Sequence, residues 1–395
     1  MGIESLSYVI DTLYAIFAMT LIIFMVPGFA MLEAGIVRTK NVTAVLTINT
    51  LIYAIASLSF LLFGYSLAFG ELGSDTMSKY AAFLFQMAFV GKVINIMSGG
   101  VSERAKVVPL AIFTIVMAAI LYPLVVNVTW GTNFLEGTIL ELSMYDLAGS
   151  TVIHSTGGWA LLAAILIIGA RRGRYTPEGG IRVIPASNIP LVTLGAFLLW
   201  IGWFGLNGGS VGSIASKENA DLVALTIMNT NTAGLSGAII VAIIMQIMYK
   251  KLDLTMILNG ALGGLVAITA GPDLYDIYTP IFIGAVGGIL VVLGVSSFDK
   301  LRIDDPVGAL SVHLLNGIWG TIAVGIFESN GEDITLVGQL KGILLIGLFT
   351  FISAYIILFI INKIIPLRAG NDEEMQGLDV EECGIEAYPE FKRAF

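Results

Sequence analysis

The sequence predicts an all-α polytopic membrane protein with eleven transmembrane helices. Of its 395 residues, 56% are apolar and only 12% are charged, about half the charged share of a typical soluble domain. The mean hydropathy is +0.89. Apolar runs of about 20 residues, the length that crosses a hydrocarbon core, recur along almost the whole chain. The fifth and tenth runs also share a motif in opposite orientation.

The eleven predicted helices follow one another with short polar connections, and the eighth and ninth are rich in glycine. They span residues 8–32, 43–69, 80–101, 107–128, 147–170, 189–213, 222–248, 254–271, 279–297, 307–327 and 338–365. We therefore predict a transmembrane domain over residues 1–366, with halves of about 1–170 and 187–327 and an extra helix at 338–365. Residues 367–395 form a cytoplasmic tail.

The basic residues predict the orientation, because positively charged loops stay on the cytoplasmic side. The ends of the odd-numbered helices and the segments after them carry Arg38, Lys40, Arg104, Lys106, Arg171, Arg172, Arg174, Arg182, Lys250, Lys251, Lys300, Arg302, Lys363, Arg368, Lys392 and Arg393. The other connections carry Glu71, Asp75, Glu136, Glu141, Glu218, Asp273, Glu328, Glu332 and Asp333, beside Lys79, Lys217 and Lys341. The N-terminus is predicted outside and the C-terminus inside.

Charge and cysteine content exclude several other classes. The net charge of −9 comes largely from the external loops and the tail, so nothing favours nucleic acid as a partner. Cys383 is the only cysteine, which excludes an intrachain disulfide. The first apolar run is too long for a cleavable signal peptide and has no basic segment before it, so we expect the first helix to be retained.

A repeat links the starts of the fifth and tenth helices. Residues 146–158 have the sequence DLAGSTVIHSTGG and residues 305–317 have DPVGALSVHLLNG. In both, Gly follows Asp by three residues and His follows it by eight. The fifth helix is predicted to enter from outside and the tenth from inside. The pattern therefore predicts an inverted repeat of helices 1–5 and 6–10, with the eleventh helix added.

The repeat predicts that His154 and His313, the only two histidines, meet near the middle of the membrane. Eight helical residues rise about 12 Å, so in a core about 30 Å thick their depths differ by about 6 Å. A packed, hydrogen-bonded core histidine is the alternative. Matching positions at a depth where ionisable groups are costly favour a functional pair.

At these residues the chain resembles the ammonium transporter family, the Amt, Mep and Rh proteins, and above all its Amt branch. The resemblance rests on MVPGFAMLEAGIVRTKN, GYSLAFG, SERAK, DLAGSTVIHSTGG, WFGLNGGS, DDPVGALSVH and GLDVEECGIEAY. It implies a homotrimer in the cytoplasmic membrane, each subunit with its own pore for ammonium or ammonia. It also implies a tail that contacts neighbouring subunits and inner loops that receive a PII-class signalling protein; a disordered tail is the alternative.

The resemblance assigns an outer recruitment site to Trp130, Phe89 and Ser210, where cation–π attraction contributes about 0.5 to 2 kcal/mol per face. Trp130 alternatively belongs to the interfacial aromatic belt. Below this site the family closes the pore with two stacked phenyl rings. Phe85 or Phe89 supplies one ring, but Leu206 occupies the second position, so the gate is predicted to be weaker or differently built. Trp203 and Asn207 flank the gate, where they either pack against other helices or line the pore.

Asp146 stands just ahead of an Ala-Gly-Ser turn, where an aspartate caps a helix. An indirect role, shaping the vestibule and adding negative field, is favoured over direct ligation of the cation. Asp305 is its counterpart, with Pro306 at the first helical position. Leu147 departs from the family, which usually has an aromatic residue there.

Past the gate, a narrow apolar pore makes passage of an intact cation expensive. Splitting ammonium into ammonia and a proton costs less, and His154 and His313 would accept ammonia and relay the proton, because imidazole titrates nearest neutral pH. The resemblance to the Amt branch favours net movement of charge.

Lys92 departs most from what a conducting pore should contain. Phe85, Phe89, Lys92 and Ile96 form one stripe on the third helix, and an unpaired ammonium at that depth costs at least about 2.5 kcal/mol. One interpretation is that Lys92 turns away, snorkels, or pairs with a polar group of a neighbouring helix. The other is that its amine reaches toward the histidines as a tethered mimic of the substrate, slowing conduction or making it depend on pH.

Two other functions of the same fold compete with transport. An ammonium sensor would report through the tail without conducting, and the lack of an output domain after the last helix disfavours it. A neutral ammonia channel is disfavoured by Asp146 and Trp130. Outside the histidine pair we find no metal-ligand cluster, phosphate loop or nucleophile–base pair, so neither an enzyme nor a metal or cofactor is predicted.

Overall fold

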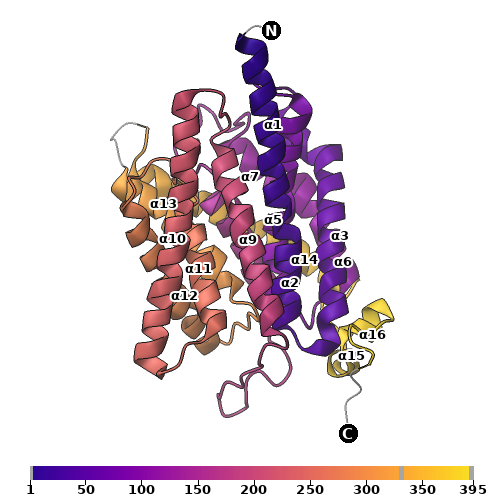
Figure 1. Cartoon of the computed structure of the whole chain (residues 1–395). Coiled ribbons are helices and arrows are strands. Elements are labelled where there is room, and N and C mark those ends of the chain that lie inside the picture. Colours follow the sequence, from indigo (N-terminus) through magenta and orange to yellow (C-terminus); the bar gives the residue numbers. More distant parts are fainter. Residues whose placement is uncertain (1–2, 329–332, 391–395) are drawn as a thin grey trace.

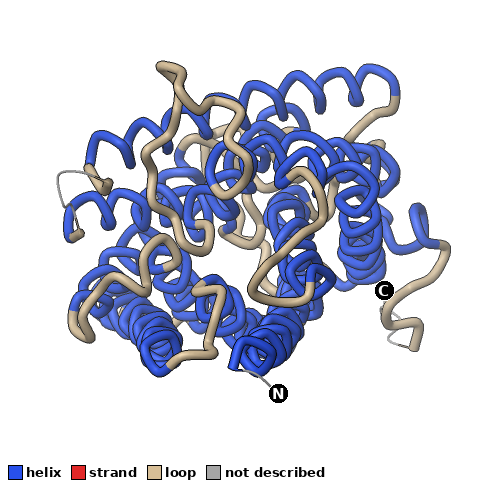
Figure 2. The backbone as a smooth tube through the Cα atoms, turned by 90° about the horizontal axis from the view of Figure 1, so that it is seen from above, coloured by secondary structure: helices blue, strands red, loops and turns tan. Residues whose placement is uncertain are grey.

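The computed structural model describes residues 3–328 and 333–390 as one bundle of helices (Figure 1). Glu332, Lys392 and Arg393, which enter the orientation argument, lie outside the described residues. Figure 2 looks down on this bundle, with the tan connections joining the helix ends. None of the described residues forms a strand, and the extended pairings among them are two isolated bridges, Ala105 with Arg368 and Tyr175 with Ile181. The prediction of an all-α membrane protein is confirmed.

The first half contains α1 (Ile3–Ile23), α2 (Met25–Ile36), η1 (Thr39–Asn41), α3 (Val42–Ser59), η2 (Phe60–Gly64), α4 (Tyr65–Phe69), α5 (Lys79–Val101), α6 (Val107–Val116), η3 (Met117–Leu121), α7 (Tyr122–Thr129), η4 (Ser150–Ser155) and α8 (Thr156–Ile168). The remainder contains α9 (Ile189–Ser210), α10 (Lys217–Tyr249), α11 (Leu254–Ile268), α12 (Thr279–Lys300), η5 (Leu310–Leu315), α13 (Asn316–Phe327), α14 (Leu336–Ile364), α15 (Asn371–Gln376) and α16 (Leu378–Cys383). Of the η segments, η2 to η5 are π-helical.

Ten helical spans in the described residues are long and apolar enough to cross a membrane, and α11, the eighth predicted span, is shorter. Its 15 residues rise about 22 Å, less than the roughly 30 Å of a hydrocarbon core. It is enclosed by α10, α12 and α13, so protein rather than lipid covers most of its surface and its length need not match the bilayer. A count of eleven crossings remains a prediction.

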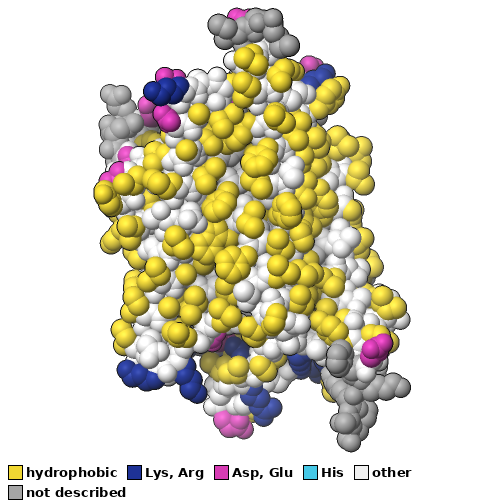
Figure 3. Space-filling model, in the orientation of Figure 1, with side chains coloured by type: hydrophobic (Ala, Val, Ile, Leu, Met, Phe, Trp, Pro, Cys, Tyr) yellow, Lys and Arg dark blue, Asp and Glu magenta, His cyan; other side chains and the backbone are white. Residues whose placement is uncertain are grey.

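The surface separates into an apolar middle and charged ends. Figure 3 shows apolar side chains across the middle of the face in view, with acidic and basic side chains gathered toward its two ends. Among the exposed large side chains are Leu61, Leu62, Phe63, Ile239 and Leu293. An apolar surface this extensive is expected to face lipid.

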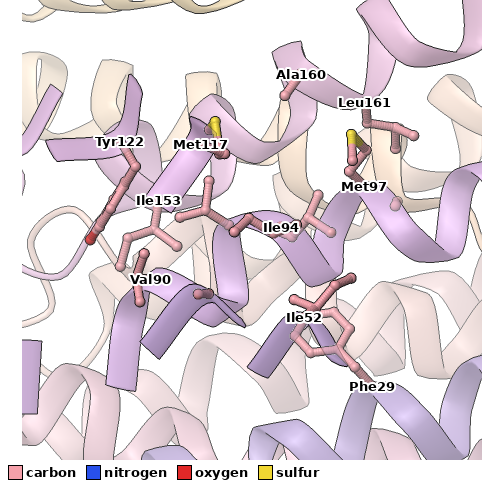
Figure 4. Packing of buried hydrophobic residues seen from close by; sticks show 14 of the residues in the cluster. Phe29, Ile52, Val90, Ile94, Met97, Met117, Tyr122, Ile153, Ala160 and Leu161 are labelled. Carbon is pink, nitrogen blue, oxygen red and sulfur yellow. The ribbon is translucent and has the colours of Figure 1, made fainter. Parts of the chain in front are cut away.

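Helix α5 occupies the centre of the buried core. Every residue from Ala88 to Val101 is buried, because α1, α3 and α8 all pack against the helix. Figure 4 shows part of this packing, in which Val90, Ile94 and Met97 lie among side chains of neighbouring helices. A polar side chain on this part of α5 is therefore held inside the bundle.

The tail packs against the loops at one end of the bundle, as α15 and α16 show at the lower right of Figure 1. The Val107 backbone N–H donates to Glu382 Oε2 at 3.0 Å, and that of Ala44 donates to Asp379 Oδ1 at 2.9 Å. Lys106 pairs with Glu373 at 2.8 Å, and this hydrogen bond holds the pKa of the Glu373 carboxyl below its usual value. The tail as far as residue 390 therefore packs on loops of its own chain, and its contact with neighbouring subunits stays a prediction.

A buried ionic cluster fixes the loop before η5. Arg171 donates its backbone N–H and Nε to Asp304 Oδ2, at 2.8 and 2.9 Å, and Arg104 Nη2 donates to the Asp304 carbonyl at 2.7 Å. Burial alone would raise the pKa of Asp304, but the hydrogen bonds from Arg171 and the charge of Arg104 lower it to about 2. The carboxylate therefore stays charged at neutral pH.

Candidate functional site

Both histidines lie in π-helical turns, His154 in η4 and His313 in η5. Each turn follows a glycine in the left-handed region, Gly149 with φ +105° and Gly308 with φ +78°. A Cβ on Gly149 would lie 2.6 Å from the Ile153 side chain, so this position requires glycine for both conformation and space. π-Helical turns are rare and often occur at functional sites.

The aspartate ahead of each glycine accepts hydrogen bonds from the free backbone N–H groups of the turn. Asp146 accepts four, at 2.8 to 2.9 Å, from Gly149, Ser150, Thr151 and Val152. Asp305 accepts three, at 2.7 to 3.3 Å, from Val307, Gly308 and Leu310. Carboxylate oxygens with this many N–H donors serve as acceptors for the helix start.

The two imidazoles meet inside the protein. His313 Nδ1 lies 3.1 Å from His154 Nδ1, and the ring planes are 19° apart. Only 1% of His154 and 4% of His313 is exposed. His154 Nε2 has no hydrogen-bond partner within the part of the chain that the structure describes. The pair can therefore pass a proton from ring to ring while at least one outer nitrogen stays available.

Different aromatic rings cover the two histidines. Trp203 stacks on His154 with centroids 5.2 Å apart, and its Nε1 donates to Thr269 Oγ1 at 2.9 Å. The Phe29 ring lies 6.1 Å from that of His313. The structure thus makes Trp203 a direct neighbour of the pair, whereas Asn207 donates to Thr230 Oγ1 at 2.9 Å in the packing of α9 and α10.

A cavity of about 220 Å³, here called the Ser210 cavity, opens at the C-terminal end of α9. Ser210 and Phe85 line it together with Tyr14, Tyr65 and Gln86. The Ser210 hydroxyl donates to the Leu206 carbonyl at 2.8 Å, which leaves its oxygen lone pairs for other donors.

The other predicted recruitment and gate residues form a chain of contacts beside this cavity. The Phe89 ring lies 4.8 Å from that of Phe85, nearly perpendicular to it, and 6.3 Å from that of Trp130. Trp130 Nε1 donates to the Asp146 carbonyl at 2.7 Å, and Leu206 is fully buried. Phe85 and Ser210 are therefore brought together at the cavity, while Phe89 and Trp130 are not among its lining residues.

A second cavity, of about 420 Å³ and here called the Asp305 cavity, opens at the N-terminal end of α9. Ile189, Arg174, Asp305 and Asn259 are among its lining residues. Because the Ser210 and Asp305 cavities lie at opposite ends of α9, the two histidines have a hollow on either side along the bundle.

Lys92 is 1% exposed, and its Nζ has no hydrogen-bond partner among the described residues. The structure therefore contains neither the snorkelling amine nor the hydrogen-bonded pair considered from the sequence. On α5, Lys92 lies between Phe85, which lines the Ser210 cavity, and Ile96, which lines a small cavity beside His313. Lys92 itself is not among the lining residues of either cavity, so it is related to them only by its place on the stripe.

Sequence reasoning missed Glu33 and Asn95, which line the small cavity with His313. Glu33 lies inside the motif quoted for the family resemblance and is the only carboxylate in the apolar run 12–36. An ionisable residue within a transmembrane run is a candidate functional residue, so a signal was present. Asn95, one turn beyond Lys92 on α5, gave a weaker one.

Comparison with known proteins assigns the family. The sequence profile of the Ammonium Transporter Family matches residues 13–388. A protein of Synechocystis sp. is 38% identical over 97% of this chain and 90% of its own length. Ammonium transporter Amt2 of Archaeoglobus fulgidus is 33% identical over 97% of this chain and 89% of its own length. The solved structure titled "Sensor Amt Protein" matches with a TM-score of 0.89 and 32% identity, over 96% of this chain and 100% of that one. The chain belongs to the Ammonium Transporter Family.

Proposed function

We propose that this chain conducts ammonium across the cytoplasmic membrane, with its N-terminus outside, its C-terminus inside and three copies forming a homotrimer. The observation that carries the proposal is the contact of 3.1 Å between two buried imidazoles, with a cavity toward each end of the bundle. Membership of the family and relatives named as ammonium transporters support the substrate.

In this proposal the Ser210 cavity is the entrance. The cation loses water there and receives in exchange the Ser210 oxygen and the faces of aromatic rings, with Phe89 and Trp130 acting from behind Phe85. Asp146 acts indirectly: its carboxylate holds the start of η4, and its carbonyl holds the Trp130 indole. Phe85 and Phe89, nearly perpendicular to each other, form the gate with Leu206 in place of two stacked rings.

Beyond the gate, ammonium gives up a proton and continues as ammonia. The free Nε2 of His154 accepts the proton, and the Nδ1 proton of His154 moves to Nδ1 of His313, whose own Nε2 proton leaves toward the Asp305 cavity. One proton enters the pair and one leaves it, so the charge of the cation crosses while the apolar pore carries only a neutral molecule. This route avoids the cost of an unpaired cation in an apolar passage.

Lys92 modulates this path in our proposal. A buried amine without a hydrogen-bond partner, on the stripe between Phe85 and Ile96, presents the same chemistry as the substrate. It slows conduction by occupying the centre of the bundle and by repelling a second cation.

The end of the bundle that carries the tail is proposed to receive a PII-class signalling protein. The basis is the resemblance of the whole chain to the Amt branch, together with the Arg and Lys residues on the loops around the Asp305 cavity. Docking of a protein there would close the exit.

An ammonium sensor is the second candidate, favoured by one finding: the chain covers all of a protein titled "Sensor Amt Protein". Lys92 fits this candidate as well, since a sensor needs to bind ammonium but not to conduct it. A neutral ammonia channel is the third.

Ammonium current under voltage clamp, in membranes reconstituted with the full chain, tests the proposal. We expect a current that requires ammonium and is not carried by potassium. Binding of ammonium without current or uptake would indicate a sensor. Uptake of ammonia, followed as an internal pH rise, without any current would indicate a neutral channel.

A further inference from the structure

Glu33 is a carboxylate inside the bundle, 1% exposed, and lies three residues before the C-terminal end of the apolar span Glu4–Ile36. Its Oε2 accepts a hydrogen bond from Asn49 Nδ2 at 2.9 Å, and its Oε1 accepts one from Ser98 Oγ at 3.0 Å. A carboxylate has about four acceptor positions, so these two neutral donors leave about half of its capacity unused.

No cation of the described chain balances Glu33. None of the ion pairs among the described residues includes it, and Lys92, on the neighbouring helix α5, does not come within ion-pair distance. A buried carboxylate without a counter-charge is costly. Protonation of the carboxyl or a bound cation would remove that cost.

The space for such a cation is present. Glu33, Asn95 and His313 line a cavity of about 20 Å³, enough for one occupant of the size of a water molecule. An ammonium ion has nearly that size. The cavity, here called the Glu33 cavity, shares Asn259 and Val307 with the Asp305 cavity, so its occupant has a short way out.

Asn95 supplies a second acceptor. It is fully buried and donates its Nδ2 to Asn49 Oδ1 at 2.5 Å, and its Oδ1 has no hydrogen-bond partner in the described part of the chain. A buried amide oxygen without a donor is uncommon. The lining thus combines a carboxylate and a free amide oxygen, which accept hydrogen bonds, and His313, whose ring completes the enclosure.

Gly99 lets the carboxylate sit this close to α5. A Cβ at this position would lie 3.2 Å from Glu33 Cδ and Oε1 and 2.9 Å from the Val307 side chain. A larger residue would displace Glu33 or Val307, which both line the cavity.

We propose that Glu33, Asn95 and His313 form a binding site for one monovalent cation of the size of ammonium, on the Asp305 side of the histidine pair. The acidic lining excludes anions, and the hydrogen-bond acceptors suit an N–H donor. The identity of the cation as ammonium rests on the proposed function. In that setting, ammonia that has passed the histidines takes a proton from His313, the proton leaves the ring nitrogen, and the resulting ammonium is held by the Glu33 carboxylate before it leaves.

Crystals of the full chain soaked in thallium(I), an ion with the charge and about the size of ammonium, test the site directly. We expect one anomalous peak within about 3 Å of the Glu33 carboxylate, in the range of direct coordination, and its loss in Glu33→Gln, which keeps the shape and removes the charge. Glu71→Gln, the same change at an exposed carboxylate that does not line the cavity, is the matched control; the peak should remain. No peak in the wild type, a peak unchanged in Glu33→Gln, or density that fits only water would overturn the proposal.

Measurement of the ammonium current distinguishes failure of the proposed cation site from failure of the proposed conduction. Glu33→Gln should lower the current about tenfold, the loss expected for one charge-assisted interaction, and Glu33→Asp should recover part of it. A thallium peak without current in the wild type would reject conduction and leave the site standing. Current in Glu33→Gln equal to that of the wild type, with no peak in either, would reject the site and leave conduction standing. Elution of both variants as the wild-type assembly is the check on folding.

Discussion

The segments around His154 and His313 share one backbone plan, an aspartate that accepts N–H groups, a glycine with positive φ and a π-helical turn, yet their neighbours differ. His154 is stacked on Trp203. His313 has Phe29 beside it and shares a cavity with Glu33. The repeat thus determines where the two imidazoles lie, and the helices packed around them determine what each can do.

The two segments are also anchored differently. Ahead of His313, Asp304 is held by the guanidinium of Arg171. Ahead of His154, Tyr145 is held by neutral partners at the backbone: its N–H donates to Gln339 Oε1 at 2.7 Å, and its carbonyl accepts from Gln339 Nε2 at 2.8 Å. The backbone contacts of Tyr145 thus involve no charge, whereas those of Asp304 do; the Tyr145 hydroxyl separately donates to Asp273 Oδ2.

The largest effect should come from removing either imidazole. His154→Ala and His313→Ala should each lower ammonium current on the order of a hundredfold, because a positioned proton-transfer group contributes at least that factor. The measurement is current in reconstituted membranes at equal amounts of folded protein. Wild-type rates in both variants would reject the relay. A large loss in only one of them would mean that the different surroundings matter more than the shared plan.

Acid should weaken the anchor formed by Arg171 and Asp304 but not the anchor formed by Gln339 and the Tyr145 backbone. The pKa of Asp304 lies below its ordinary value, at about 2, so its stabilisation is complete above about pH 4 and is lost as the pH falls toward 2. Asp304→Asn should destabilise the protein at pH 7 by about 3 kcal/mol, as expected for breaking a buried pair, and should remove this part of the acid sensitivity. Thermal unfolding in detergent at several pH values measures both. Gln339→Ala, at the neutral anchor, should destabilise equally at pH 7 and pH 3.

Substitution of the two aspartates that accept backbone N–H groups, Asp146 and Asp305, compares the two segments in more detail. Asp146→Ala should cost about 1 to 2 kcal/mol of stability, the upper range for a lost cap, and should reduce transport more than Asp146→Asn, because asparagine keeps one of the two acceptor oxygens. Asp305→Ala should cost less, since the hydrogen bonds to that carboxylate reach 3.3 Å, whereas those to Asp146 are all 2.8 to 2.9 Å. Equal and complete loss of transport in Asp146→Asn and Asp146→Ala would instead indicate that the charge itself lies on the path of the cation.

The smallest expected effect is an increase in ammonium flux. Lys92→Ile should raise ammonium flux roughly fivefold, as removal of about 1 kcal/mol of repulsion does, and should make the flux less dependent on pH. Lys92→Arg, which keeps a charge, is the control and should not raise it. An unchanged rate and pH profile in Lys92→Ile at normal expression would exclude Lys92 from the pore.

Much of the fold could be predicted from the sequence, because each apolar run must become a helix that satisfies its own backbone in lipid. The exception is α11, whose glycines allow close packing among other helices and free it from the length that lipid demands. The four π-helical segments left no trace in the apolar pattern. The contact of His154 with His313 followed from their places in the repeat, although that argument treated both segments as regular α-helix.

The surroundings of the histidines could not be predicted in the same way. Trp203, Glu33 and Asn95 reach the site from three different helices, and no spacing along the chain relates them. Their arrangement depends on how α2, α5 and α9 cross, which is decided by small residues at the crossings, such as Gly195, where a Cβ would lie 2.3 Å from the Leu32 backbone nitrogen.

The π-helical turn of η4 also limits which changes of the amino-acid sequence the protein can tolerate. One residue inserted or deleted between Gly149 and His154 would turn the imidazole by about 100° and shift it by about 1.5 Å along the axis. Either change exceeds what a ring contact of 3.1 Å can absorb. The same holds for the stretch from Gly308 to His313. Both stretches therefore tolerate substitutions but neither insertions nor deletions. The number of residues between glycine and histidine is fixed by the distance across which the two rings must meet.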